Sequence, residues 1–256
     1  MYFDFHTHLD FYKDEEISEV LDLIISERIK CFSASVNIES FKRNLKIKEM
    51  LSKKESLENL IEVGFGVHPS FCKNLPEKEN EAVNLLSPYY EKSDIISEIG
   101  LDFFWEKECP KAKQILHFLI ALENAENNNK ICVIHTKGAE KEVYDILKDF
   151  PHAKPVIHWY DGPVEIYKKF LSKGYYQTFG CELKYSESIK NFLKMTPLEL
   201  LLPETDNPTG EIWLGGTDDT PGLINRVYKD ISEVTGKTEE EIENILERNL
   251  NNLRLK

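Results

Sequence analysis

The chain opens with MYFDFHTHLD, residues 1–10, in which two histidines lie one residue apart inside a short apolar run. In a β-strand the side chains of residues i and i+2 point to the same face, so His6 and His8 are expected to lie side by side. Asp4 and Asp10 continue the same alternation. Two neutral imidazoles suit a transition metal. A partly buried strand with hydrogen-bonded histidines is the structural alternative, and this segment leaves both interpretations open.

The opening run is followed by an amphipathic helical pattern at residues 15–29, and this pairing of strand and helix recurs along the chain. Further helical patterns lie at residues 114–128, 139–150, 163–174 and 238–255, and the last begins with a capping box, Thr238 and Glu241. Strands are predicted at residues 2–9, 30–37, 60–68, 95–102, 130–137, 154–161, 175–182 and 198–206.

Eight strands separated by helices imply right-handed crossovers and a parallel sheet. The simplest such fold is a (β/α)8 TIM barrel, predicted here as a single domain over residues 1–256. A doubly wound open sheet is the alternative, but it rarely needs eight regular units. The charge-rich segment at residues 48–59 is interpreted as a solvated helix face.

The composition is that of a globular protein with a substantial core: 41% hydrophobic and 30% charged residues. Neither a membrane span nor a signal peptide is expected, so a cytoplasmic location is predicted. The net charge of -13 argues against broad adhesion to nucleic acid, which needs a basic surface. It does not exclude an enzyme that meets phosphates through metal ions.

The five cysteines are an odd number and form no C-x-x-C pair. We therefore expect neither a disulfide framework nor a cysteine zinc site. Three of them, Cys31, Cys132 and Cys181, fall in predicted strands and are interpreted as small core residues.

Polar residues gather toward the ends of the predicted strands. Five of the seven histidines and two carboxylates take part: His6, His8, His68, Glu98, His135, His158 and Asp206. In a (β/α)8 barrel the carboxyl ends of the strands form the rim of the active site. Each residue alone has a structural explanation, but a common position at strand ends favours a site. His117, within a helix, and His152, in a loop, are interpreted as structural.

Imidazoles and carboxylates without a thiolate suit Zn²⁺, Mn²⁺, Fe²⁺ or Mg²⁺ in a hydrolytic site. Glu98 lies centrally among the histidine-bearing strands, where it could bridge two ions. Two ions about 3.5–4 Å apart stabilise both the attacking and the leaving oxygen of a phosphoryl displacement.

Six motifs in this order carry a family resemblance: HTHLD, GVHPS, EIGLD, VIHTKGA, VIHWYDG and PETDNP. Together they resemble the TatD family of metal-dependent deoxyribonucleases, which belongs to the amidohydrolase-type metal barrels. The resemblance extends from the first strand to about residue 208.

The resemblance implies two divalent metal ions, of unspecified identity among Zn²⁺, Mn²⁺ and Mg²⁺. His6 and His8 would bind one ion, His135 and His158 the other, and Glu98 would bridge them. Asp206 would be a metal ligand and would take the proton of the attacking water, so Asp206 and Glu98 are the predicted catalytic residues.

The predicted substrate contacts are His68, Lys137, Glu204 and Trp213. His68 would lie near the phosphate, and Glu204 would orient ligands or a water. Lys137 stands where the family usually has Arg, which suggests a point-charge contact with a phosphate. After TDNP the chain departs from the family pattern, because TGEIWLGGTDDTPGLI contains no Arg before Arg226. Trp213 in this loop is either a platform for a base or a residue packed on the barrel rim.

The leading hypothesis is a hydrolase that cleaves DNA phosphodiester bonds by metal-activated water, as an exonuclease on single-stranded or frayed ends. An alternative is another hydrolase of the same barrel type, acting on a phosphoester, lactone or amide. A third hypothesis is a non-catalytic scaffold barrel within a complex, which would be marked by lost metal ligands.

Overall fold

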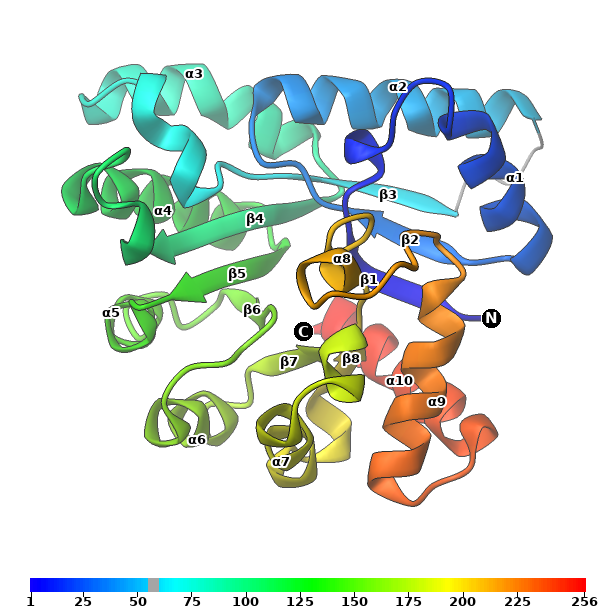
Figure 1. Ribbon diagram of the computed structural model, residues 1–256. Helices are drawn as coiled ribbons and strands as arrows, with labels where there is room; N and C mark the ends of the chain where they lie inside the picture. Colours follow the sequence, from blue (N-terminus) through cyan, green and yellow to red (C-terminus); the bar gives the residue numbers. More distant parts are fainter. Residues whose placement is uncertain (55–59) are drawn as a thin grey trace. The chain divides into compact units, whose positions relative to one another are not determined.

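The strands of this computed structural model, which describes residues 1–54 and 60–256, follow one another in a single parallel sheet. The eight strands have the order β1 to β8, and helices lie between successive strands (Figure 1). In a doubly wound sheet the strand order reverses at a switch point, so sequential order confirms the (β/α)8 class. The strands are β1 Phe3–Thr7, β2 Lys30–Ser33, β3 Ile61–Phe65, β4 Ile95–Asp102, β5 Ile131–Lys137, β6 Lys154–Ile157, β7 Tyr176–Phe179 and β8 Leu201–Pro203.

Ten α-helices are present in the described residues: α1 Ile17–Glu27, α2 Ile38–Lys54, α3 Glu79–Lys92, α4 Lys111–Asn127, α5 Glu140–Leu147, α6 Val164–Ser172, α7 Glu187–Met195, α8 Gly210–Trp213, α9 Leu223–Thr235 and α10 Glu239–Leu255. Short 3-10 helices are η1 Leu9–Phe11, η2 Pro69–Asn74, η3 Phe103–Trp105, η4 Cys181–Lys184 and η5 Leu198–Leu200. The first part of the segment predicted as a solvated helix face belongs to α2, and residues 55–59 lie outside the described residues.

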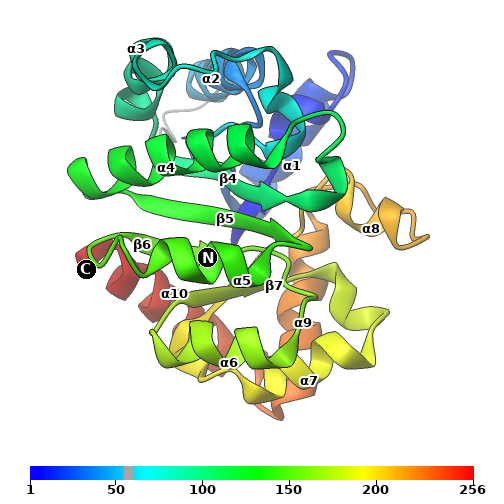
Figure 2. The ribbon, with the colours of Figure 1, turned by 90° about the vertical axis from the view of Figure 1, so that its left-hand side faces the viewer.

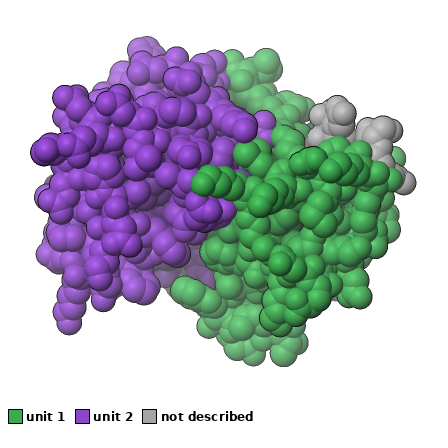
Figure 3. All heavy atoms as spheres, turned by 90° about the horizontal axis from the view of Figure 1, so that it is seen from above, with its two compact units in different colours: residues 1–34, 42–63, 177–256 green, residues 35–41, 64–176 purple. Residues whose placement is uncertain are grey.

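The chain divides into two compact units, coloured in Figure 3. The first unit comprises Met1–Ala34, Lys42–Val63 and Gln177–Lys256, and the second comprises Ser35–Phe41 and Gly64–Tyr176. The extent of a single domain over residues 1–256 stays a prediction.

In the first unit the first strand of the sheet, β1, meets the segment that follows the last strand, β8. β7 pairs with β8, and β1 pairs with β2. The segment after β8 joins β1 through backbone hydrogen bonds, in which Asp206 N donates to His6 O at 2.9 Å and His8 N donates to Asn207 O at 2.7 Å. α9 and α10 contact each other and β8 (Figure 1). The predicted capping box of α10 is confirmed, because the Thr238 and Glu241 side chains accept each other's backbone N–H groups.

In the second unit β4 pairs with β5, and β5 with β6. All eight residues of β4 are buried, as expected for a parallel strand that is covered on both faces. α4 packs against β4 and α5 against β5 (Figure 2). Glu98 is therefore a buried carboxylate in the middle of β4, and Ser97 and Asp102 are the other buried polar residues of this strand.

Six of the eight predicted strands end two to four residues earlier than expected: β1, β2, β3, β6, β7 and β8. β6 ends at Ile157 and β8 at Pro203, so His158 and Asp206 lie in the connections that follow. Trp159 and Asp206 have φ values of 41° and 55°, and a left-handed residue cannot continue a strand.

The expectation about cysteines is wrong for one pair. Cys72 and Cys109 form a disulfide bond with a Cα–Cα distance of 5.9 Å, within the usual range. The two residues are 37 positions apart, in the turns that follow the neighbouring strands β3 and β4, and sequence spacing alone does not show that these turns meet. Cys31, Cys132 and Cys181 are buried free thiols, as predicted.

Among the described helices, none combines the length and apolar character that crossing a bilayer requires.

Candidate metal centre

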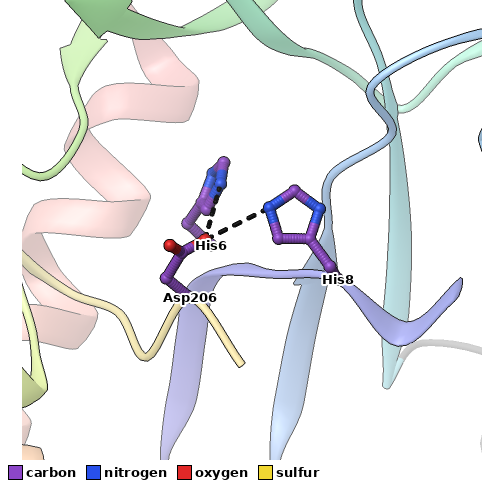
Figure 4. Close-up of side chains that lie close together, drawn as sticks. All are labelled: His6, His8 and Asp206. Atoms are coloured by element: carbon purple, nitrogen blue, oxygen red, sulfur yellow. Dashed lines mark ion pairs between the residues drawn. The ribbon is translucent and has the colours of Figure 1, made fainter. Parts of the chain in front are cut away.

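His6, His8 and Asp206 form a cluster in the first unit (Figure 4). His6 lies in β1, and His8 follows this strand directly. Asp206 Oδ1 lies 3.1 Å from His8 Nε2 and 3.6 Å from His6 Nε2. The structure thus brings together three predicted ligands from opposite ends of the chain, and their ligand atoms all lie within 4.8 Å of one another.

The segment that carries Asp206 is fixed by Asp4. The buried Asp4 carboxyl group accepts hydrogen bonds from the backbone N of Thr205, at 3.0 Å, and from the Thr205 hydroxyl. It also accepts one from the backbone N of His6 at 3.2 Å. Burial raises the pKa of Asp4 to about 8, although these hydrogen bonds oppose the shift. Asp4 therefore links the strand that bears His6 to the turn that bears Asp206.

A second cluster lies in the second unit around Glu98 of β4. Its Oε1 is 2.7 Å from Nδ1 of His135, in β5. His68 Nε2 and His158 Nε2 lie 3.7 Å and 3.8 Å from the same oxygen. Four predicted site residues therefore meet within this unit.

The charges of this cluster are strongly coupled. Burial would raise the pKa of Glu98, but the imidazoles of His68, His135 and His158 outweigh it and hold the pKa well below its usual value. Burial would lower the pKa of His135, but its hydrogen bonds to Asp102 and Glu98 outweigh burial and raise it. Glu98 is thus kept ionised, which is the form that binds a cation.

Asp102 is a member of this cluster that was not predicted from the sequence. Its Oδ2 lies 3.0 Å from His135 Nε2, on the opposite side of the ring from Glu98. His68, Asp102 and His135 form a second possible metal-binding group, with ligand atoms within 4.8 Å of one another. The signal was available, because Asp102 is the last residue of the EIGLD motif and ends β4.

The predicted substrate contacts have different environments. Lys137 forms an ion pair with Asp161 at 2.7 Å and donates a hydrogen bond to Trp159 O at 2.8 Å. Its charge is therefore compensated within the protein. Glu204 is fully buried after β8, whereas Trp213 is 82% exposed at the end of α8.

The loop that departs from the family pattern is held by a buried carboxylate. Glu211 lies 2.9 Å from Nη1 of Arg226 and 3.3 Å from Nζ of Lys184, and it accepts a hydrogen bond from Tyr185 Oη. These contacts outweigh burial and lower the pKa of Glu211. Arg226 thus anchors α8 to α9.

The two histidines interpreted as structural belong to neither cluster. His117 is buried in α4, and His152 is an exposed loop residue.

Known proteins resemble this chain in sequence and in fold. The family model described as "TatD related DNase" matches residues 3–254. An uncharacterized metal-dependent hydrolase of Bacillus subtilis, YabD, is 28% identical over 264 residues, covering 99% of this chain and 98% of YabD. MJ1582 of Methanocaldococcus jannaschii, also named an uncharacterized metal-dependent hydrolase, is 25% identical over 251 residues, covering 97% and 94% of the two chains. The crystal structure of YJJV, a TatD homolog from Escherichia coli, superimposes with a TM-score of 0.80 at 20% identity, covering 98% and 97%.

Proposed function

The chain belongs to the TatD-related DNase family of metal-dependent hydrolases, and from this premise we propose that it hydrolyses the phosphodiester bonds of DNA. We further propose that it acts as an exonuclease on single-stranded or frayed ends, in the cytoplasm. The observation that carries the proposal is the pair of His and carboxylate clusters at and beyond the carboxyl ends of the strands.

The residues present fit divalent metal ions. Each cluster combines imidazoles with carboxylates, and no thiolate is among its residues, which is the donor set of hydrolytic Zn²⁺ or Mn²⁺ sites. His6, His8 and Asp206 would hold one ion, His135 and His158 would hold a second, and Glu98 would be the carboxylate ligand that the family resemblance predicts. When bound, such ions would lower the pKa of a water and neutralise negative charge on the phosphate.

The protein's own residues would supply the remaining chemistry. Asp206 would accept the proton of the attacking water, and its Oδ1 already faces His8 at 3.1 Å. Glu98 stays ionised and so contributes negative charge for the ions. His68 and Lys137 would contact the phosphate, and Glu204 would orient a ligand or a water.

The chain's charge makes local contacts decisive. With a net charge of -13, no long-range basic field attracts a polyanion. When a phosphate binds, Lys137 must either break its ion pair with Asp161 or contact both negative groups at once. The ions, rather than a basic surface, are therefore the main source of attraction for the substrate.

A hydrolase of a phosphoester, lactone or amide is the alternative within the same fold class. Related barrels often bridge their ions with a carboxylated lysine, whereas here a glutamate, Glu98, takes that predicted position. A non-catalytic scaffold is disfavoured, because every predicted metal ligand is present.

Two measurements test the proposal. The first compares turnover of a labelled single-stranded oligodeoxynucleotide, a small phosphomonoester and a lactone, each with several divalent ions and with a chelator. We expect the oligodeoxynucleotide to be the best substrate and the chelator to abolish its turnover. A higher kcat/KM for the lactone would support the alternative, and turnover of none of the three would support the scaffold.

The second measurement is metal content by elemental analysis. Replacing His6 and His8 together by Ala should lower the bound metal per chain while the fold is kept, because two imidazoles at a strand end carry little of the core. The control is His152→Ala, an exposed loop histidine. Full metal content in the double variant would contradict the ligand assignment.

A further inference from the structure

Exposed aromatic side chains have an uneven distribution over the described residues. Among the described residues they occur only in or beside the first short helix that comes after a strand: η1 after β1, η2 after β3, η3 after β4, the C-cap of η4 after β7, and α8 after β8. Within the described chain the outer helices also expose some large apolar side chains, but none of these is aromatic. Leu85 in α3 is an example. The exposed aromatic residues are Phe11, Phe71, Phe104, Trp105, Tyr185 and Trp213.

This distribution is not explained by folding. A large apolar side chain left in water contributes little to stability, and Phe104 is 78% exposed. Clustered exposed apolar groups generally mark binding sites. Three of the candidate metal ligands also lie just beyond the carboxyl ends of strands: His8, His158 and Asp206.

Two of these rings contact predicted site residues. The ring of Phe11 stacks on His8 with a centroid distance of 4.6 Å and an interplanar angle of 10°. In the second unit the ring of Phe71 meets His68 edge to face at 6.3 Å. In each unit, therefore, one exposed aromatic ring lies beside a residue assigned to a metal ion or to the phosphate.

Phe104 is the best-defined of these positions. Its backbone N donates to Oδ1 of Asp102 at 2.9 Å, and Oδ2 of Asp102 lies 3.0 Å from His135 Nε2. The ring packs over Gly138, where an added Cβ would lie 3.5 Å from it. Phe104 is thus positioned through Asp102 relative to His135, while its ring remains open to solvent.

We propose that Phe104 is a stacking platform for an unpaired base beside the scissile phosphodiester and so determines the preference of the enzyme for base-bearing, single-stranded substrates. This inference rests on the proposed function. Every nucleobase presents a π-face, so stacking supplies affinity without sequence preference. It also supplies affinity without basic residues, which suits an acidic chain whose Lys137 is already paired with Asp161.

The test compares two single-stranded oligodeoxynucleotides of equal length, one normal and one with abasic sugars at its two terminal positions on either end. The wild-type enzyme should prefer the normal strand by about 5- to 150-fold in kcat/KM, the range expected for one stacked base. Phe104→Ala should lose most of this preference through a raised KM for the normal strand, with unchanged metal content. Phe104→Tyr, which keeps the ring, should retain the preference.

Leu85→Ala is the matched control, because it removes an exposed apolar side chain from α3 of the same unit. It should keep the wild-type preference. If Phe104→Ala also kept that preference while the wild-type enzyme cleaved both strands, the stacking role would be wrong and the nuclease proposal would stand. If the wild-type enzyme cleaved neither strand, both proposals would fall together.

Discussion

Asp206 occupies a backbone conformation that few residues tolerate. Its φ of 55° lies in the left-handed region, which Asp and Asn enter more readily than other residues with a side chain. Asp206→Asn therefore keeps both size and backbone conformation but removes charge and basicity. We predict that kcat falls by about two orders of magnitude or more, since general-base catalysis contributes roughly 10²–10⁴-fold. Steady-state turnover of a labelled oligodeoxynucleotide at saturating metal measures this effect.

The control for Asp206→Asn is the thermal stability of the metal-free proteins. Bound ions stabilise the folded state by mass action, so only the metal-free comparison reports folding. We expect melting temperatures close to wild type. Near-normal turnover in the variant would remove Asp206 from the proposed chemistry.

At the residue scale, the sequence predicted which side chains lie close together more accurately than it predicted their ion pairs and hydrogen bonds. His6, His8 and Asp206 were predicted together although about 200 positions separate them, because strand order and fold class place strand ends in one layer. The pairing of Lys137 with Asp161 was not predictable, because it depends on the course of the turn after β6. Asp102 was missed for a similar reason: its contact with His135 follows from the register of β4 and β5.

A buried histidine outside the site gives a prediction about pH. Burial, with a smaller effect of nearby Lys113, lowers the pKa of His117 to about 4. In the unfolded chain His117 has its ordinary pKa of 6.5. Between about pH 6.5 and pH 4 the unfolded state therefore binds a proton that the folded state does not bind. The contribution of His117 to stability is therefore lost as the pH falls from about 6.5 to 4.

The measurement is urea unfolding of the metal-free wild type and of His117→Leu at several pH values. Between about pH 7 and about pH 4.5, the stability of the wild type should fall by about 2 kcal/mol more than that of the variant. Parallel pH profiles for the two proteins would show that His117 titrates normally in the folded state.

At the scale of elements, β4 contains a glycine that the structure requires. Gly100 has a φ of 139°, and a Cβ there would lie 2.0 Å from the carbonyl oxygen of His135 in β5. Gly100→Ala should destabilise the protein by about 2 kcal/mol or more, because positive φ and a backbone clash act together. For a chain of this size, that loss lowers the melting temperature by roughly 4 °C or more.

Gly174, which follows α6, provides the matched control. Its φ is 69°, but nothing lies within 4 Å of an added Cβ. Gly174→Ala should therefore show only the smaller cost of the left-handed conformation, about 1 kcal/mol. Equal melting temperatures for the two variants would contradict the close approach of β4 and β5 at Gly100.

Local sequence patterns predicted the presence of strands and helices more reliably than the residues at which they end. Eight strands and the capped start of α10 were predicted, because apolar periodicity and capping residues are local signals. The early ends of β6 and β8 were not predicted. Trp159 and Asp206 adopt left-handed conformations that stop extended backbone, and neither residue is a glycine, which would have indicated such a conformation. The Cys72–Cys109 bond was also missed, because it joins two turns on neighbouring strands.

At the scale of the whole molecule, the fold class was predictable because regular alternation of strands and helices admits few topologies. Substrate preference was not predictable to the same degree, because it depends on exposed turns after the strands. The loop with Trp213 departs from the family pattern, and the exposed ring of Phe104 becomes evident only from its surroundings.

The central claim is that metal ions bound by the His and carboxylate clusters enable this chain to hydrolyse DNA. Its most direct test is the turnover of a labelled single-stranded oligodeoxynucleotide as metal-free protein is titrated with Zn²⁺, Mn²⁺ or Mg²⁺. We predict no turnover without metal, a rise that saturates near two bound ions per chain, and release of nucleotides from one end of the strand. Turnover that persists in the chelated protein, or its absence when two ions are bound, would contradict this claim.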